Sequence, residues 1–94
     1  MSTYMTNQFI QEAQRSGYSL TYDGREIALA ATQERTWGSA GFTAELEVLE
    51  GDAVVGYITP YTDDEHGAVS ERRFGQVAPA VFRTLEDALR EILR

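Results

Sequence analysis

The feature that most constrains the fold is an alternation of residue types between residues 41 and 61. Apolar or aromatic side chains alternate with polar or acidic ones through FTAELEV, which begins at Phe42. A period of two is typical of a strand with one buried face. Glu50-Gly51-Asp52 then turns the chain, and residues 53–61 return rich in β-branched and aromatic residues. The stretch therefore predicts a β-hairpin.

The length of the turn decides which side chains of this hairpin are buried. A two-residue loop, formed by Glu50-Gly51 or Gly51-Asp52, is the favoured arrangement. It places five side chains on the buried face, namely Phe42, Leu46, Val48, Val55 and Tyr57. The other face then carries Glu45, Glu47, Leu49, Val54, Gly56 and Ile58. A three-residue loop would shift the returning strand by one residue and exchange its faces, but one face carries carboxylates in either register.

The residues before this hairpin predict a helix and a second hairpin. Residues 1–5 are a short lead, after which Thr6 or Asn7 can cap the start of a helix and Gly17 can end it. The inner face of this helix would carry Phe9, Ile10 and Ala13. Asp23-Gly24 then separates alternating runs over 18–22 and 25–32, which is a strong hairpin signal because a type I′ turn needs positive φ at both central residues. Residues 33–40 read as a polar loop that holds Trp37, the only tryptophan.

The residues after the central hairpin predict a loop, an edge segment and a helix. Residues 62–70 break the periodicity and indicate an exposed acidic loop, and residues 71–76 are a candidate for a fifth strand. Pro79 cannot donate to a strand ladder, so residues 77–82 suit an edge strand or an extended crossover. Thr84 caps a final helix, which must pack on the sheet because it carries an apolar stripe of Leu85, Ala88, Leu89, Ile92 and Leu93.

Together these elements predict a single α+β domain over residues 1–94. Its expected architecture has two layers: an antiparallel sheet of four to five strands, built from two hairpins, with the N-terminal and C-terminal helices on one face and the other face open. Without cysteine the chain has neither disulfides nor a thiolate metal site. The start of the chain lacks the features of a signal peptide and no long apolar run occurs, so a cytoplasmic location without a membrane partner is expected.

The charge of the chain is unevenly distributed. The net charge is −7, yet no lysine or arginine occurs between Arg35 and Arg72. Eight acidic residues lie in that interval: Glu45, Glu47, Glu50, Asp52, Asp63, Asp64, Glu65 and Glu71. A field of one sign repels nucleic acid and attracts basic protein surfaces. Plain solubility is the competing explanation.

No motif in the chain points to catalysis or to a cofactor. Asp63-Asp64-Glu65-His66 offers metal-binding atoms, but consecutive side chains point in different directions and the EF-hand spacing is missing, so a solvated loop explains the cluster. His66 is the only histidine, and neither a GxSxG motif nor a glycine-rich phosphate loop occurs. We therefore expect no enzyme and no cofactor, and direct nucleic-acid binding is disfavoured by the net charge.

The functional expectation is a small acidic binding protein that docks onto a basic, nucleic-acid-binding protein. Its predicted contact residues are Glu45, Glu47, Glu50, Asp52, Asp63, Asp64, Glu65 and Trp37. Alternate side chains of a strand lie about 6.6–6.8 Å apart, close to the spacing of phosphates along a nucleic-acid strand. Compact acidic inhibitors, such as phage-encoded anti-CRISPR inhibitors of bacterial defence, share these properties, although no family motif can be quoted from the chain.

Three alternatives stay open at this point. In the first alternative, the protein is a metal- or small-ligand-binding domain that uses the loop over residues 63–66. An immunity-type protein would use the same acidic surface against another partner. A homodimer, rather than a monomer, would form by pairing exposed strand edges or sheet faces.

Overall fold

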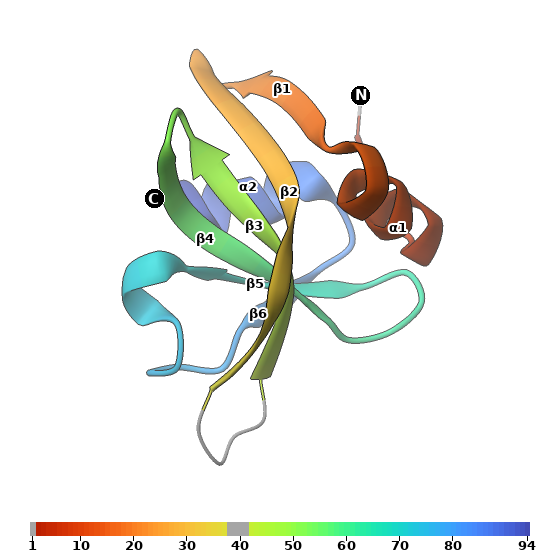
Figure 1. The fold of residues 1–94 in the computed structure, drawn as a ribbon, viewed down its shortest axis with the longest axis vertical. Coiled ribbons are helices and arrows are strands. Elements are labelled where there is room, and N and C mark those ends of the chain that lie inside the picture. The colour runs from red at the N-terminus through yellow and green to blue at the C-terminus, as the bar shows by residue number, and fades with distance from the viewer. Residues whose placement is uncertain (1, 38–41) are drawn as a thin grey trace.

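The computed structural model describes residues 2–37 and 42–94, with side chains described for 2–32 and 44–94 (Figure 1). Its elements are α1 (Asn7–Ser16), β1 (Tyr18–Tyr22), β2 (Arg25–Trp37), β3 (Phe42–Glu50), β4 (Ala53–Pro60), β5 (His66–Ser70), the 3-10 helix η1 (Glu71–Arg73), β6 (Ala80–Phe82) and α2 (Leu85–Leu93). The strands form one antiparallel sheet in the order β1-β2-β3-β4-β5-β6, so each strand pairs with its neighbours in the chain. The α+β class is confirmed.

The sheet has six strands where four to five were expected, and it is curled rather than flat (Figure 1). The α2 helix lies behind the sheet in this view and α1 lies beside β2. Buried side chains of both helices, such as Ile10 and Leu89, share one hydrophobic core with Leu46 and Ile58 of the sheet. Because of the curl, the expected two-layer packing stays a prediction. Neither helix in the described part of the chain has the length and apolarity needed to cross a membrane.

The ends of both helices agree with the local signals in the sequence. The Thr6 side chain accepts a hydrogen bond from the Phe9 backbone N–H at 3.1 Å, and Gly17 ends α1 with φ 76°. In the same way Thr84 Oγ1 accepts from the Asp87 backbone N–H at 3.3 Å at the start of α2. These contacts satisfy backbone groups that a helix end leaves free.

The first hairpin has the predicted turn but a longer second strand. Asp23 and Gly24 have φ values of 52° and 74°, as a type I′ turn requires. After an irregularity between Ala31 and Arg35, β2 continues to Trp37, whose backbone pairs with Phe42. The prediction of a loop from residue 33 is therefore wrong for 33–37. The Trp37 side chain lies outside the described part of the structure.

The central hairpin combines the favoured turn with the other register. Glu50 pairs with Ala53 across a two-residue Gly51-Asp52 turn, but the register shifts between Val48 and Leu49, and Val48 pairs with Gly56. This bulge skips Val55 and moves the rest of β4 by one residue. The expected faces of the returning strand are thus exchanged beyond the bulge: Ile58 is fully buried in the main core and Tyr57 lies on the opposite face.

The segment after β4 differs most from expectation. The loop predicted over residues 62–70 ends at residue 65, and His66–Ser70 forms the buried strand β5. The candidate fifth strand over residues 71–76 contains η1 instead. Only β6 agrees, since Ala80–Phe82 is the outermost strand of the sheet as the position of Pro79 suggested.

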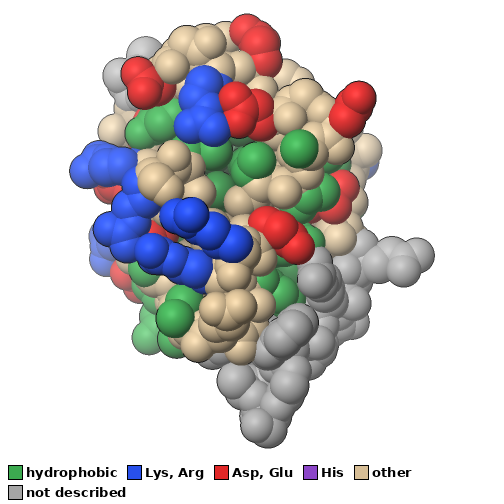
Figure 2. Space-filling model, turned by 90° about the vertical axis from the view of Figure 1, so that its left-hand side faces the viewer, with side chains coloured by type: hydrophobic (Ala, Val, Ile, Leu, Met, Phe, Trp, Pro, Cys, Tyr) green, Lys and Arg blue, Asp and Glu red, His purple; other side chains and the backbone are tan. Residues whose placement is uncertain are grey.

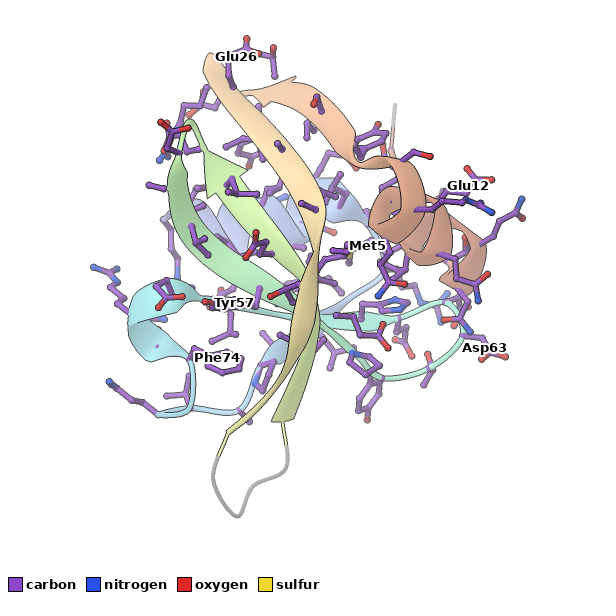
Figure 3. The ribbon with its side chains drawn as sticks, in the orientation of Figure 1. Met5, Glu12, Glu26, Tyr57, Asp63 and Phe74 are labelled. Atoms are coloured by element: carbon purple, nitrogen blue, oxygen red, sulfur yellow. The ribbon has the colours of Figure 1, made fainter. Side chains whose placement is uncertain are left out.

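The N-terminal lead is part of the fold. Met5 is fully buried in the core, where Figure 3 shows it between α1 and the sheet. Its backbone N–H donates to the Arg83 carbonyl at 2.8 Å, and Leu85 N–H donates to the Thr3 carbonyl at 2.8 Å. These bonds join the lead to the segment that connects β6 with α2.

Candidate functional site

The outer face of β3 carries two of the predicted contact residues. Leu46 and Val48 point into the main core, and because side chains alternate along a strand, Glu47 between them points to the other side of the sheet. Glu45 is the next alternate position of β3, and both glutamates are half-buried. No ion pair among the described residues involves either of them, so these two carboxylates have no counter-charge from an ion pair in that part of the chain.

The same face carries a second, smaller hydrophobic cluster. Tyr57 pairs with Glu47 across β3 and β4, and its ring lies 4.7 Å from the ring of Phe74, centroid to centroid. Both aromatic side chains are 4% exposed, and Figure 3 shows them side by side below β4. The segment after β5 therefore covers part of a face that we expected to be open. It leaves the carboxylate of Glu47 beside an apolar cluster.

At the tip of the central hairpin the chain neutralises one of its own acids. Arg25 Nη2 lies 2.5 Å from Glu50 Oε1 and Arg25 Nε donates to Glu50 Oε2 at 2.9 Å, a bidentate pair. The hydrogen bond from Arg25 lowers the pKa of Glu50. Asp52, in the turn, is exposed. Of these two predicted contact residues, only Asp52 has no ion pair with an arginine among the described side chains.

The acidic loop after β4 is also partly neutralised and tied to the fold. Asp63 accepts a hydrogen bond from Asn7 Nδ2 at 3.0 Å, and its carbonyl accepts from the Asn7 backbone N–H at 3.0 Å, so the loop lies against the start of α1 (Figure 3). Glu65 forms an ion pair with Arg83 at 3.7 Å. Asp64 is exposed and accepts from Thr62 Oγ1 at 3.3 Å.

The predicted contact residues thus fall into three groups. The hairpin tip and the acidic loop lie at opposite ends of β4, about 25 Å apart along an extended strand. Figure 2 shows acidic side chains scattered over one side of the molecule, with arginines gathered at its edge. Glu45 and Glu47 form the third group, two residues apart on β3.

The loop over residues 63–66 does not gather its four side chains around a common point. His66 is 1% exposed in β5, and its Nδ1 has no hydrogen-bond partner in residues 2–32 and 44–94. Burial lowers the pKa of His66, against the opposing effects of a hydrogen bond to the Met5 backbone and the charge of Glu45. Within the described part of the chain, no group of three or more His, Asp or Glu residues is arranged to hold a metal ion.

Sequence reasoning did not find a hollow at the C-terminal end of α2. Its volume is about 300 Å³, and Arg25, Arg72 and Arg94 are among the residues that line it. These arginines come from three distant parts of the chain, so no local pattern connects them. The pair Arg72-Arg73 was the only local signal.

Comparison with protein-family models, with curated proteins and with solved structures finds no match to this chain. Function must therefore be inferred from the geometry of the site.

Proposed function

We propose that the protein is a non-enzymatic binding protein that docks the outer face of β3 onto a basic surface of a partner protein. The observation that carries this proposal is the pair Glu45 and Glu47: two half-buried carboxylates at alternate positions of a central strand, without an ion-pair partner among the described residues. A carboxylate that is partly removed from water gains more from an incoming cation than a fully solvated one.

The chemistry of this face suits an arginine-bearing partner. Arginine binds a carboxylate through two parallel hydrogen bonds. Glu47, which is half-buried beside the cluster that contains its cross-strand neighbour Tyr57, supplies the carboxylate. Asp52 and Asp64, both exposed, add to a net charge of −7 that steers a basic surface toward the protein.

The partner class that follows is a nucleic-acid-binding protein, because its basic groove is built for closely spaced negative charges. The protein would then act in the cytoplasm as an inhibitor that competes with nucleic acid, as phage-encoded anti-CRISPR inhibitors do by the same physical means. Glu50 and Glu65 contribute less than the sequence suggested, since each already has an arginine of its own.

The test compares two variants with the same net charge. Glu45→Gln/Glu47→Gln removes the carboxylates of the outer face with almost no change of shape. Glu12→Gln/Glu26→Gln removes two exposed acids elsewhere, which Figure 3 shows on α1 and at the first hairpin. Each protein is immobilised and used to capture partners from bacterial lysate at low and high salt.

We expect the wild type and the Glu12/Glu26 variant to capture the same basic protein, and the Glu45/Glu47 variant to lose it. Loss of two hydrogen bonds between charged groups corresponds to a weakening of well over tenfold. The captured protein must then compete with nucleic acid for binding. Equal capture by all three proteins, or equal loss in both variants, would contradict a specific contact through β3. Thermal melting confirms that the variants are folded.

A further inference from the structure

The hollow at the C-terminal end of α2 has a charged border and an apolar floor. Arg25, Arg72 and Arg94 border it, and Val55, Ile92 and Leu93 supply apolar surface. Its volume of about 300 Å³ is at the lower end of the range for small-molecule sites.

A buried hydroxyl without a partner lies in the wall of this hollow. Ser70 lines it, is 8% exposed, and its Oγ has no hydrogen-bond partner within the described part of the chain. Ser70 also precedes η1 in the position of a helix cap, yet its side chain makes no capping bond. A buried hydroxyl without a partner is costly, so such a group in a folded protein calls for an explanation, such as a bound water, an ion or a functional role.

The arginines around the hollow differ in whether they already form an ion pair with a glutamate. Arg25 is held by Glu50 at 2.5 Å, and Arg94 pairs with Glu91 at 3.4 Å. Arg72 is exposed and takes part in no ion pair among the described residues. It donates only a long hydrogen bond, 3.4 Å, to the Arg94 carbonyl.

The ion pairs around the hollow leave one arginine of its border to receive an anion of one charge. Glu50 offsets Arg25 and Glu91 offsets Arg94, whereas Arg72 forms no ion pair among the described residues. Glu71 also lines the hollow. The C-terminal end of α2 carries a partial negative charge, which further disfavours a dianion such as phosphate.

We propose that this hollow binds a monocarboxylate with an apolar carbon chain. The carboxylate lies between the Arg72 guanidinium and the Ser70 hydroxyl, and the carbon chain packs on Val55, Ile92 and Leu93. Such a group occurs in a free fatty acid and at the C-terminus of a peptide that ends in an apolar residue. The site lies apart from the outer face of β3, so a test of this site does not depend on whether the proposed function is correct.

The competing explanation is structural: Arg72 serves only to bind the last carbonyl of the helix region. That role accounts for the guanidinium but leaves the buried Ser70 hydroxyl unexplained. The two explanations differ in whether a carboxylate ligand binds at all.

The experiment titrates the full chain, labelled with ¹⁵N, with hexanoate and with N-acetyl-leucine at low salt. Hexanoate represents a free fatty acid and N-acetyl-leucine the end of a peptide, and the matching uncharged amides are the controls. We expect saturable shifts of the amide signals of residues 70–72 and 92–94 with one or both acids. The acid that binds more tightly identifies the source. Binding by neither acid, or equal binding of acid and amide, overturns the proposal.

Two neighbouring arginines provide a matched pair of variants. Arg72 lines the hollow, whereas Arg73, the next residue of η1, pairs with Glu91 at 3.7 Å and does not border it. Arg72→Gln should raise the dissociation constant by about tenfold or more, and Arg73→Gln should leave it within about twofold, because a hydrogen bond to a charged group is typically of that strength.

Ser70→Ala provides the second readout. It removes the hydroxyl and should also weaken binding of the carboxylate by about tenfold. The melting temperature should not fall, because the substitution also removes a buried oxygen without a partner. Equal effects of Arg72→Gln and Arg73→Gln, or wild-type affinity in Ser70→Ala, would overturn the site as described.

Discussion

Substitution of Gly56 by alanine tests how closely α2 packs on the sheet. A Cβ atom at this position would lie 2.5 Å from Ile92 Cγ2 and 2.7 Å from the Val69 carbonyl oxygen. Neither neighbour yields easily. Ile92 is β-branched and lies in a helix, where its side chain has one strongly preferred rotamer, and the Val69 oxygen belongs to the β5 backbone.

The expected loss of stability follows from these two contacts. Overpacking by one methyl group costs about 1–3 kcal/mol, and a clash with backbone favours the upper part of that range. Replacement of glycine also restricts the unfolded chain, which returns about 0.4–1 kcal/mol. We therefore expect Gly56→Ala to lower the free energy of unfolding by about 2 kcal/mol. For a domain of this size that corresponds to a fall in melting temperature of about 8–16 °C.

A double-mutant cycle with Ile92→Ala separates the two contacts. In the Ile92→Ala background both Ile92 Cγ atoms are gone, and only the Val69 oxygen still opposes the new methyl group. The cost of Gly56→Ala should then fall to about 1 kcal/mol or less, a coupling of at least about 1 kcal/mol. Urea unfolding followed by circular dichroism measures all four proteins.

Gly51→Ala is the control for this cycle. A Cβ at Gly51 meets nothing within 4 Å, but φ is +62°, so its cost arises from the backbone and should not couple to Ile92. A Gly56→Ala protein that melts within about 2 °C of the wild type would refute the close approach of α2 to β4. So would a loss of stability that is the same in both Ile92 backgrounds.

Three further predictions concern the core and its charges. The pKa of His66 in the folded protein lies below its ordinary value of 6.5, so as the pH falls the unfolded chain binds a proton at this side chain before the folded protein does. The free energy of unfolding should therefore be constant above about pH 7 and fall as the pH drops below 6.5 toward the folded-state pKa. Urea unfolding at pH 7.5 and 5.5 measures this fall, and an unchanged slope in His66→Gln would assign it to other groups. Leu89→Ala should cost about 2–5 kcal/mol in urea unfolding, since Leu89 is fully buried, whereas a loss below 1 kcal/mol would contradict its place in the core. Glu50→Gln should lower the melting temperature at low salt but not at 1 M salt, because its partner Arg25 is partly exposed and dissolved salt screens the ion pair. The same loss at both salt concentrations would argue against an electrostatic cause.

Local signals in the sequence were sufficient for the helix ends and the first turn. Thr6, Gly17 and Thr84 act on backbone groups within a few residues of themselves, so the local sequence is enough to predict where each helix begins or ends. Asp23-Gly24 likewise sets its own backbone angles. The same holds for the apolar stripe of α2, which needs only helical periodicity to be recognised.

The candidate site was only half predictable. The alternation of residue types correctly predicted that Glu45 and Glu47 lie in a strand, β3, because a strand has a fixed period of two. The pairing of Glu50 with Arg25 depends on which strands are neighbours, and so does the position of the acidic loop at the far end of β4. Charge counted along the chain could not reveal these contacts.

By itself the sequence determined the α+β class, both helices and both predicted turns, since propensity, capping and periodicity act over a few residues. The tertiary structure decided the register of β4, where a bulge at Val55 buried Ile58 in the main core and turned Tyr57 to the opposite face of the sheet. It also decided that His66–Ser70 is a buried strand. That short segment has only Ala68 and Val69 as apolar side chains, and it is held in the sheet by ladders to β4 and β6 on its two sides. Pairing between strands is a relation between distant residues, and it overrides the local preference of a short segment.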